Sequence, residues 1–272
     1  MSTGASFARL AEAPAFAISF WRCGLAALVF LPFARGKLLT ELNALNGREQ
    51  MLLVLSGICL SVHFAAWITS LEHTTVAASV LLVNTSPIWV ALLSRFIGEG
   101  VLSRKMRWGM LASFCGSAIV AWGDFGGASQ ALLGDGLALL GAMAGSVYLV
   151  IGRRLRPQLS LPCYVTLCYG VAAFCLLVLS MATETQLTGF DSKTWWWLLA
   201  CALVPQVLGH TSANWALRWA TAPMVAISLL GEPLGSILLA VLFLNELPPA
   251  QALAGTPLIL LGILMAARSE KR

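Results

Sequence analysis

Charged residues are scarce in this chain of 272 residues: they make up 11% of it, whereas 58% of the residues are hydrophobic and the mean hydropathy is +0.83. Because soluble globular domains contain about 25% charged residues, the composition excludes an ordinary soluble domain. The alternation of polar and apolar residues that marks a membrane-spanning β-barrel is also missing. The chain contains instead a series of apolar runs, each near the roughly 20 residues that cross a bilayer as a helix.

These runs predict an all-α polytopic membrane protein with nine full transmembrane helices. The predicted spans are residues 16–34, 50–70, 76–97, 106–123, 131–152, 161–182, 195–217, 222–244 and 250–267.

Motifs for metal, nucleotide and redox chemistry are missing as well. The seven cysteines lie scattered in the apolar runs, with no Cys-x-x-Cys pair and no histidine at metal-ligand spacing, which indicates small hydrophobic residues and not metal ligands. No Walker-type phosphate-binding loop occurs in the sequence. We therefore expect no metal, no cofactor and no ATP-driven step.

The basic residues are distributed unevenly among the gaps between the predicted spans. The net charge of +5 could indicate nucleic-acid binding, but all of the 17 basic residues except Arg9, Arg22 and Lys193 lie in alternate gaps and in the C-terminal tail. Basic residues mark the cytoplasmic side of a membrane protein. The charge pattern therefore predicts a multi-pass protein of the cell (inner) membrane, with a cytoplasmic C-terminus and no nucleic-acid partner.

The chain carries an internal repeat at an offset of 146 residues. The matching landmarks are Pro87 with Pro233, Gly109 with Gly255, and Gly116 with Gly262. We expect two copies, residues 1–125 and 130–268, in a ten-helix fold that lacks most of its first helix, through a misplaced start codon or a genuine shortening. Because each copy of the complete fold has five helices, the second copy enters the membrane from the opposite side, an inverted repeat typical of secondary transporters.

Polar side chains inside the apolar runs indicate helix faces that meet protein or water, because lipid offers them no partners. A spacing of four residues places side chains on one face of a helix. The predicted binding residues are His63, Trp67, Asn84, His210, Asn214 and Glu232. We also expect Pro87 and Pro233 to bend their helices near the midplane and to free the carbonyl groups of Val83 and Leu229.

Structural roles compete with binding roles at several of these positions. Glu232 could instead pair with Arg22, His63 or His210, and each histidine could be a hydrogen-bonded core residue. Trp67 could be a packing residue whose position on the face of His63 is incidental.

Two further features have a structural interpretation. Arg22 lies about seven residues into its span, and we expect its side chain to extend toward the outer membrane surface. Gly141 and Gly145 form a GxxxG pair, which allows two helices to approach closely but does not specify a function.

The repeat, the topology and three stretches together resemble the drug/metabolite transporter superfamily, specifically its EamA-type members. The stretches are FWRCGLAALVFLPFARGK, HFAAWITSLEHTTVAASVLLVNTSPIWVALLSRFIGE and TAPMVAISLLGEPLGSILLAVLFLNELPPAQALAGTPLILLGILMAA. The resemblance covers nearly the whole chain. It implies ten helices in two inverted five-helix repeats, export of small metabolites, and a central cavity at the six predicted binding residues.

The predicted function is a secondary transporter that exports small metabolites or amino acids by alternating access through a central cavity. Its partners would be a small-molecule substrate and membrane lipid, with proton coupling through Glu232 as an option. The alternative is an intramembrane enzyme for a lipid-linked substrate, with His63, His210 and Glu232 as acid and base groups. The sequence has no nucleophile–base arrangement, metal cluster or long catalytic loop, so we do not expect an enzyme. A channel or an inactive remnant is a third interpretation, if the chain is genuinely shortened.

Overall fold

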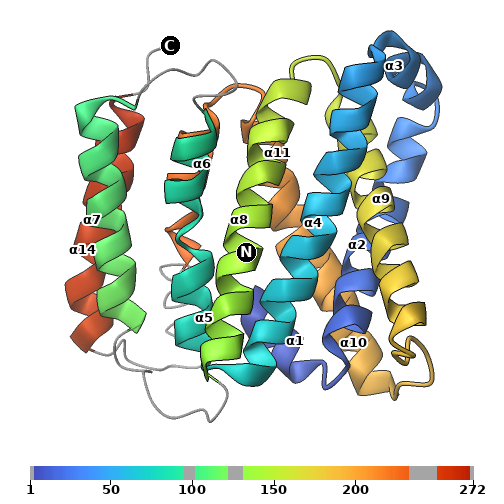
Figure 1. Cartoon of the computed structure of the whole chain (residues 1–272), viewed down its shortest axis with the longest axis horizontal. Coiled ribbons are helices and arrows are strands. Elements are labelled where there is room, and N and C mark those ends of the chain that lie inside the picture. The colour runs from blue at the N-terminus through green and yellow to red at the C-terminus, as the bar shows by residue number, and fades with distance from the viewer. Residues whose placement is uncertain (1–2, 95–101, 122–130, 233–249, 270–272) are drawn as a thin grey trace.

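The computed structural model describes residues 3–94, 102–121, 131–232 and 250–269, and every regular element in these ranges is a helix. Figure 1 shows the long helices running side by side. The helices are α1 (Gly4–Leu10), α2 (Ala15–Ala34), α3 (Leu38–Ala44), α4 (Gly47–His73), α5 (Val76–Val83), α6 (Ser86–Ser94), α7 (Arg104–Ala121), α8 (Ala131–Leu155), α9 (Leu161–Ala182), α10 (Ser192–Cys201), η3 (Ala202–His210), α11 (Thr211–Ala216), α12 (Ala222–Leu229) and α14 (Ala250–Ala267).

Helix occupies the described part of every predicted span, so the prediction of an all-helical membrane protein is confirmed. Within the described residues, α2, α4, α8 and α9 are each long and apolar enough to cross a bilayer without interruption. Two predicted spans are divided: residues 76–97 contain α5 and α6, and residues 195–217 contain α10, η3 and α11. The short helices α1 and α3 lie outside the predicted spans.

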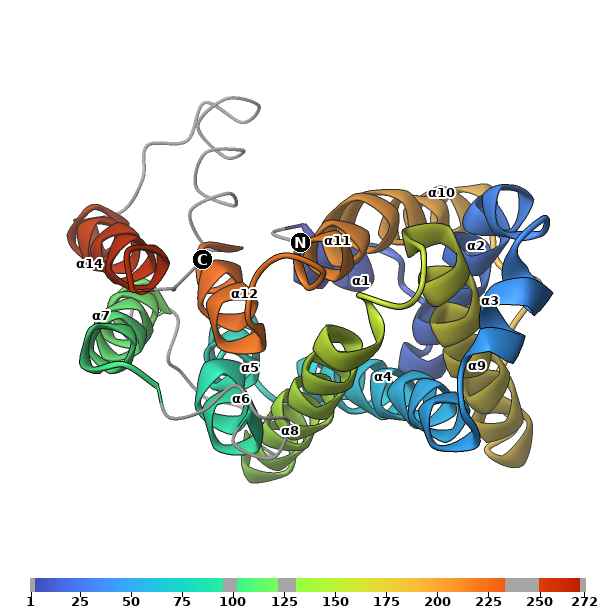
Figure 2. The same ribbon diagram turned by 90° about the horizontal axis from the view of Figure 1, so that it is seen from above.

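The helices pack as a bundle with one pair at its end. The most extensive contacts join α4 to α8, α2 to α9, and α7 to α14. Viewed from above, α7 and α14 lie together at one end, and α12, α5 and α6 separate them from α8 (Figure 2). The buried core lies mainly among α2, α4, α8 and α9, where Leu60, Phe64, Tyr164 and Tyr169 are fully buried.

Glycines determine how closely α7 and α14 approach. A Cβ added to Gly109 would lie 2.6 Å from the carbonyl oxygen of Gly262, and one added to Gly116 would lie 2.7 Å from that of Gly255. Real Cβ atoms do not approach backbone so closely. Each helix therefore uses the absence of a side chain to bring its backbone against that of the other helix.

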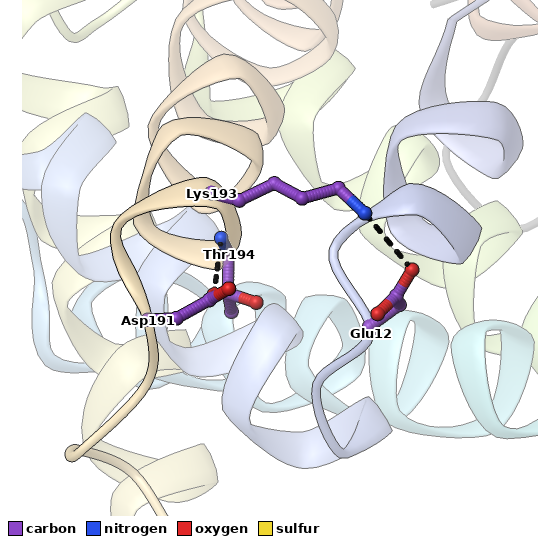
Figure 3. A network of polar contacts seen from close by, with 4 residues as sticks. All are labelled: Glu12, Asp191, Lys193 and Thr194. Carbon is purple, nitrogen blue, oxygen red and sulfur yellow. Dashed lines mark hydrogen bonds and ion pairs between the residues drawn. The ribbon is translucent and has the colours of Figure 1, made fainter.

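Side chains of the local sequence determine where several helices begin. At the start of α4, Asn46 Oδ1 accepts a hydrogen bond from the Glu49 N–H, and the Asn46 N–H donates to the Glu49 carboxylate, both at 3.0 Å. At the start of α10, Asp191 accepts from the Thr194 N–H at 2.8 Å (Figure 3). Lys193 in the same turn donates to Glu12 at 3.2 Å and so links the segment after α1 to α10.

The break between α5 and α6 falls at Asn84 and Thr85, directly before Pro87. Proline has no N–H, so the carbonyl of Val83, four residues earlier, loses its helical partner. The Ser86 hydroxyl donates to that carbonyl at 2.6 Å in its place. The side chain next to the proline thus satisfies the carbonyl, and the Asn84 side chain lies at the interruption. Pro233, the corresponding residue of the second copy, lies outside the described residues.

A second irregularity is η3, a π-helical stretch that contains Pro205 and ends at His210. π-Helical turns bond residue i to i+5 and therefore contain more residues than α-helical turns. Side chains four apart along η3 and α11 consequently do not stay on one face.

Candidate functional site

A cavity of about 60 Å³ lies where α2, α4, η3, α12 and the break between α5 and α6 meet. Its polar lining consists of Arg22, His63, Trp67, Asn84, Ser86, His210 and Glu232. The apolar remainder comes from residues such as Val83, Ala226 and Leu229. Polar groups at this depth of a membrane protein are costly and are therefore typical of substrate or ion pathways.

His63 is held in place by α8. Its Nδ1 lies 2.8 Å from the carbonyl oxygen of Gly141, and because a carbonyl only accepts, the proton of this hydrogen bond is on Nδ1. A Cβ on Gly145 would lie 2.8 Å from the same nitrogen. The two glycines of the GxxxG pair therefore let α8 approach α4 closely enough to orient the imidazole.

Aromatic rings form one side of the cavity. The rings of His63 and Trp67 are stacked, with 15° between their planes and 6.1 Å between their centroids. His210 lies 6.0 Å from His63 and packs edge-on against Phe64 at 5.0 Å. Both histidines, one from α4 and one from η3, thus line the same cavity and pack against aromatic rings of α4.

Arg22 does not extend to the membrane surface as the sequence suggested. The side chain is 1% exposed, and its Nε donates to Gln206 Oε1 at 2.7 Å. Its guanidinium lies over the ring of Phe64, 4.2 Å from the centroid. The prediction was wrong because it considered the depth of Arg22 along its own helix, whereas α4 and η3 cover the side chain from the sides. Arg22 and Gln206 are site residues that the sequence analysis did not include, although an arginine inside an apolar run was itself a signal.

Glu232 lies three residues after the end of α12 and lines two spaces. One is the cavity. The other is an adjoining groove of about 600 Å³ between α12 and the consecutive helices η3 and α11. Leu229 also lines both spaces. Glu232 and Arg22 line the same cavity, and their opposite charges interact electrostatically.

Asn84 and Asn214, the two predicted asparagines, are in different surroundings. Asn84 lines the cavity from the break between α5 and α6. Asn214 is buried away from it: its Nδ2 donates to the hydroxyl of Tyr169 at 3.0 Å, and its backbone carbonyl oxygen accepts from Arg156 Nε at 2.8 Å. The π-helical turns before Asn214 change the register that the spacing of four assumed. The structure thus brings five of the six predicted residues together and separates Asn214 from them.

Apolar helices of membrane-spanning length around a buried polar cavity are the architecture of a multi-pass membrane transporter. The model of the EamA-like transporter family matches residues 1–122 and 132–268. The chain belongs to this family.

Similar proteins agree with this assignment. An uncharacterized transporter of Archaeoglobus fulgidus is 25% identical over 267 residues, which are 96% of this chain and 90% of that protein. The uncharacterized transporter YdfC of Bacillus subtilis is 22% identical over 240 residues, 88% of this chain and 77% of its own. A solved crystal structure with 19% identity superposes with a TM-score of 0.81 and covers 99% of this chain and 94% of its own, which shows a shared fold.

Proposed function

We propose that the protein is a secondary transporter that exports a small metabolite, such as an amino acid, by alternating access through the central cavity. In this proposal residues 1–125 and 130–268 form two repeats with opposite membrane orientation, and the C-terminus lies in the cytoplasm. His63, Trp67, Asn84, His210 and Glu232 contact the substrate, and Glu232 binds a proton or a substrate ammonium group. Asn214 supports the cavity from outside, through its bonds to α9 and to Arg156.

The packing of α7 on α14 supports the inverted repeat. The offset of 146 residues relates Gly109 to Gly255 and Gly116 to Gly262. A two-fold axis between the repeats then turns a contact of Gly109 with Gly262 into a contact of Gly255 with Gly116. Both contacts occur.

A second contact between these helices fits the same axis. Ser113 and Ile259 are also 146 residues apart, so an axis that passes between α7 and α14 would bring them together. The Ser113 hydroxyl donates to the Ile259 carbonyl at 3.2 Å.

The observation that carries the transport proposal is the cluster of polar side chains at the cavity between the break at Asn84 and the residues after α12. Polar side chains meet at this one place from α2, α4, η3 and the break before α6, and Glu232 adds a further one from the segment after α12. A cavity of about 60 Å³ admits a few polar atoms but not a whole metabolite. The helices around it therefore rearrange during a transport cycle, which alternating access requires.

Transport by purified protein in liposomes tests the proposal. The liposomes are loaded with a radiolabelled metabolite mixture, and efflux is compared for the parent chain, for Glu232→Gln and for the control Glu12→Gln, whose carboxylate is 69% exposed. We expect efflux by the parent and the control and its loss in Glu232→Gln. Equal efflux by Glu232→Gln would show that the carboxylate at the cavity has no transport role.

The orientation of the repeats has its own test. Single cysteines at Arg104, Arg154 and Glu184 are labelled in intact cells with a membrane-impermeant maleimide, with the unsubstituted chain as background. The proposal predicts labelling at Glu184 alone. Labelling of Arg104 and Arg154 from different sides would contradict the inverted repeat.

A further inference from the structure

Three side chains of the cavity carry hydrogen-bond donors that have no acceptor among the described residues. These donors are Arg22 Nη1, Trp67 Nε1 and Asn84 Nδ2. The side chains are 1%, 9% and 6% exposed, so bulk water does not reach these groups. A buried donor without an acceptor costs free energy, and three at one cavity call for an explanation.

The surroundings of Arg22 increase this excess of donors. Gln206 turns its only acceptor atom, Oε1, to Arg22 Nε, which leaves Gln206 Nε2 without an acceptor in the described part of the chain. The bond to Gln206 and the contact with the ring of Phe64 fix one edge and one face of the guanidinium. Arg22 is thus anchored while its Nη1 remains available.

Other buried donors of the same kinds are satisfied, so the pattern is not general in this protein. Arg156 is as buried as Arg22, but its Nε and Nη1 donate to the carbonyl oxygens of Asn214 and Leu159. The Nε1 of Trp21 donates to the carbonyl of Leu187 at 2.8 Å. Among the described residues, the buried side-chain N–H donors without an acceptor therefore gather at the cavity, whereas the other buried donors in this condition are hydroxyl groups.

We propose that Arg22, Trp67 and Asn84 form a recognition site for a carboxylate group of the transported molecule, an inference that rests on the proposed function. A carboxylate has only acceptors, carries the charge opposite to Arg22 and matches the planar guanidinium. A cavity of about 60 Å³ accommodates such a group. The remainder of the molecule extends past Leu229 into the adjoining groove, which is lined mainly by apolar residues.

The proposal makes Arg22 a substrate-binding residue. The substrate carboxylate then binds in a cavity where Glu232 and Arg22 already interact electrostatically. This carboxylate provides the hydrogen-bonded anion that the buried guanidinium of Arg22 requires.

Matched pairs of compounds test the chemistry. Liposomes with the full chain are loaded with radiolabelled L-leucine, L-phenylalanine, L-threonine and benzoate, and in parallel with the carboxamide of each, together with the metabolite mixture used above. We expect efflux of at least one free acid and an efflux at least about tenfold slower for its amide, since hydrogen bonds to a charged group are among the stronger ones. Efflux of mixture components that all lack a carboxylate, or equal efflux of acid and amide, would overturn the inference while the proposed function stands. Absence of any efflux would contradict the proposed function and, with it, the inference.

A pair of tryptophan variants separates recognition from folding, because Arg22→Gln could simply fail to fold. Trp67→Phe keeps an aromatic ring beside His63 and removes the N–H without an acceptor, together with the second ring of the indole. We expect its KM for the transported acid to rise about tenfold. Its thermal stability should fall by less than that of the control Trp21→Phe, because both variants lose the same ring area and only the control loses a hydrogen bond. The control Trp21→Phe removes an N–H that has an acceptor, and should lower stability while KM is unchanged. A less stable Trp67→Phe protein with the parental KM would show that Trp67 only packs.

Discussion

Replacing Gly145 by alanine tests whether the close approach of α8 to α4 orients the imidazole of His63. The added Cβ would lie 2.8 Å from His63 Nδ1, 3.2 Å from Cε1 and 3.3 Å from Cγ. The ring has little freedom to move away, because Nδ1 donates to the Gly141 carbonyl at 2.8 Å. Either the ring turns and this hydrogen bond is lost, or α8 moves away from α4.

Each of these responses has a similar cost. If the hydrogen bond between His63 and Gly141 is lost, its buried groups are left without partners, which destabilises the protein by about 1–3 kcal/mol. If α8 moves instead, the overpacked contact between α8 and α4 costs about 1–3 kcal/mol. Alanine favours the helix over glycine by about 1 kcal/mol, which offsets part of this. Gly136 on the same helix has no atom within 4 Å of an added Cβ, so Gly136→Ala gains the helix preference without the clash. The stability difference between the two variants is therefore about 1–3 kcal/mol, the steric term alone.

Thermal unfolding of detergent-purified protein measures this difference. At about 2–4 °C per kcal/mol for chains approaching this size, Gly145→Ala should unfold several degrees below Gly136→Ala. In the His63→Ala background, Gly145→Ala should lower the unfolding temperature much less than it does in the parent chain, because the imidazole atoms that clash with the added Cβ are absent. Gly145→Ala as stable as Gly136→Ala, with unchanged transport, would refute the argument that this glycine orients His63.

Three further predictions concern the packing and the helix ends. Gly116→Ala places a Cβ 2.7 Å from the Gly255 carbonyl oxygen, and because backbone cannot move aside, we expect a loss of about 1–3 kcal/mol in the same unfolding assay; an unchanged midpoint would contradict the glycine contact. The hydrogen bond from the Thr194 N–H lowers the pKa of Asp191. Its carboxylate therefore stabilises the start of α10 at neutral pH, and this contribution is lost as the pH falls through the lowered pKa. Amide exchange in α10, corrected for intrinsic rates, should show this acid sensitivity in the parent and not in Asp191→Asn. Lys193→Ala removes an ion pair whose side chains are 62% and 69% exposed (Figure 3), so unfolding should change by less than about 1 kcal/mol, and a larger loss would indicate an unrecognised contact.

The helical, membrane-spanning character of the protein could be predicted from its apolar runs alone. Apolar runs near 20 residues leave the backbone no partners except its own carbonyl and N–H groups, so each run forms a helix whatever its neighbours are. The cost of polar groups in lipid likewise indicated that Glu232, His63 and His210 face inward. Length and composition act on each segment separately, which is why they could be interpreted without a structure.

Which of the inward-facing residues meet depends on the packing between helices and could not be predicted from the sequence. Arg22 joined the cavity because α4 and η3 cover it, and the depth of a residue along its own helix contains no information about such neighbours. Asn214 was separated from the cavity because the π-helical turns around Pro205 change the register of the side chains that follow. Contacts between segments depend on side-chain packing across helices, and the spacing within one helix cannot specify them.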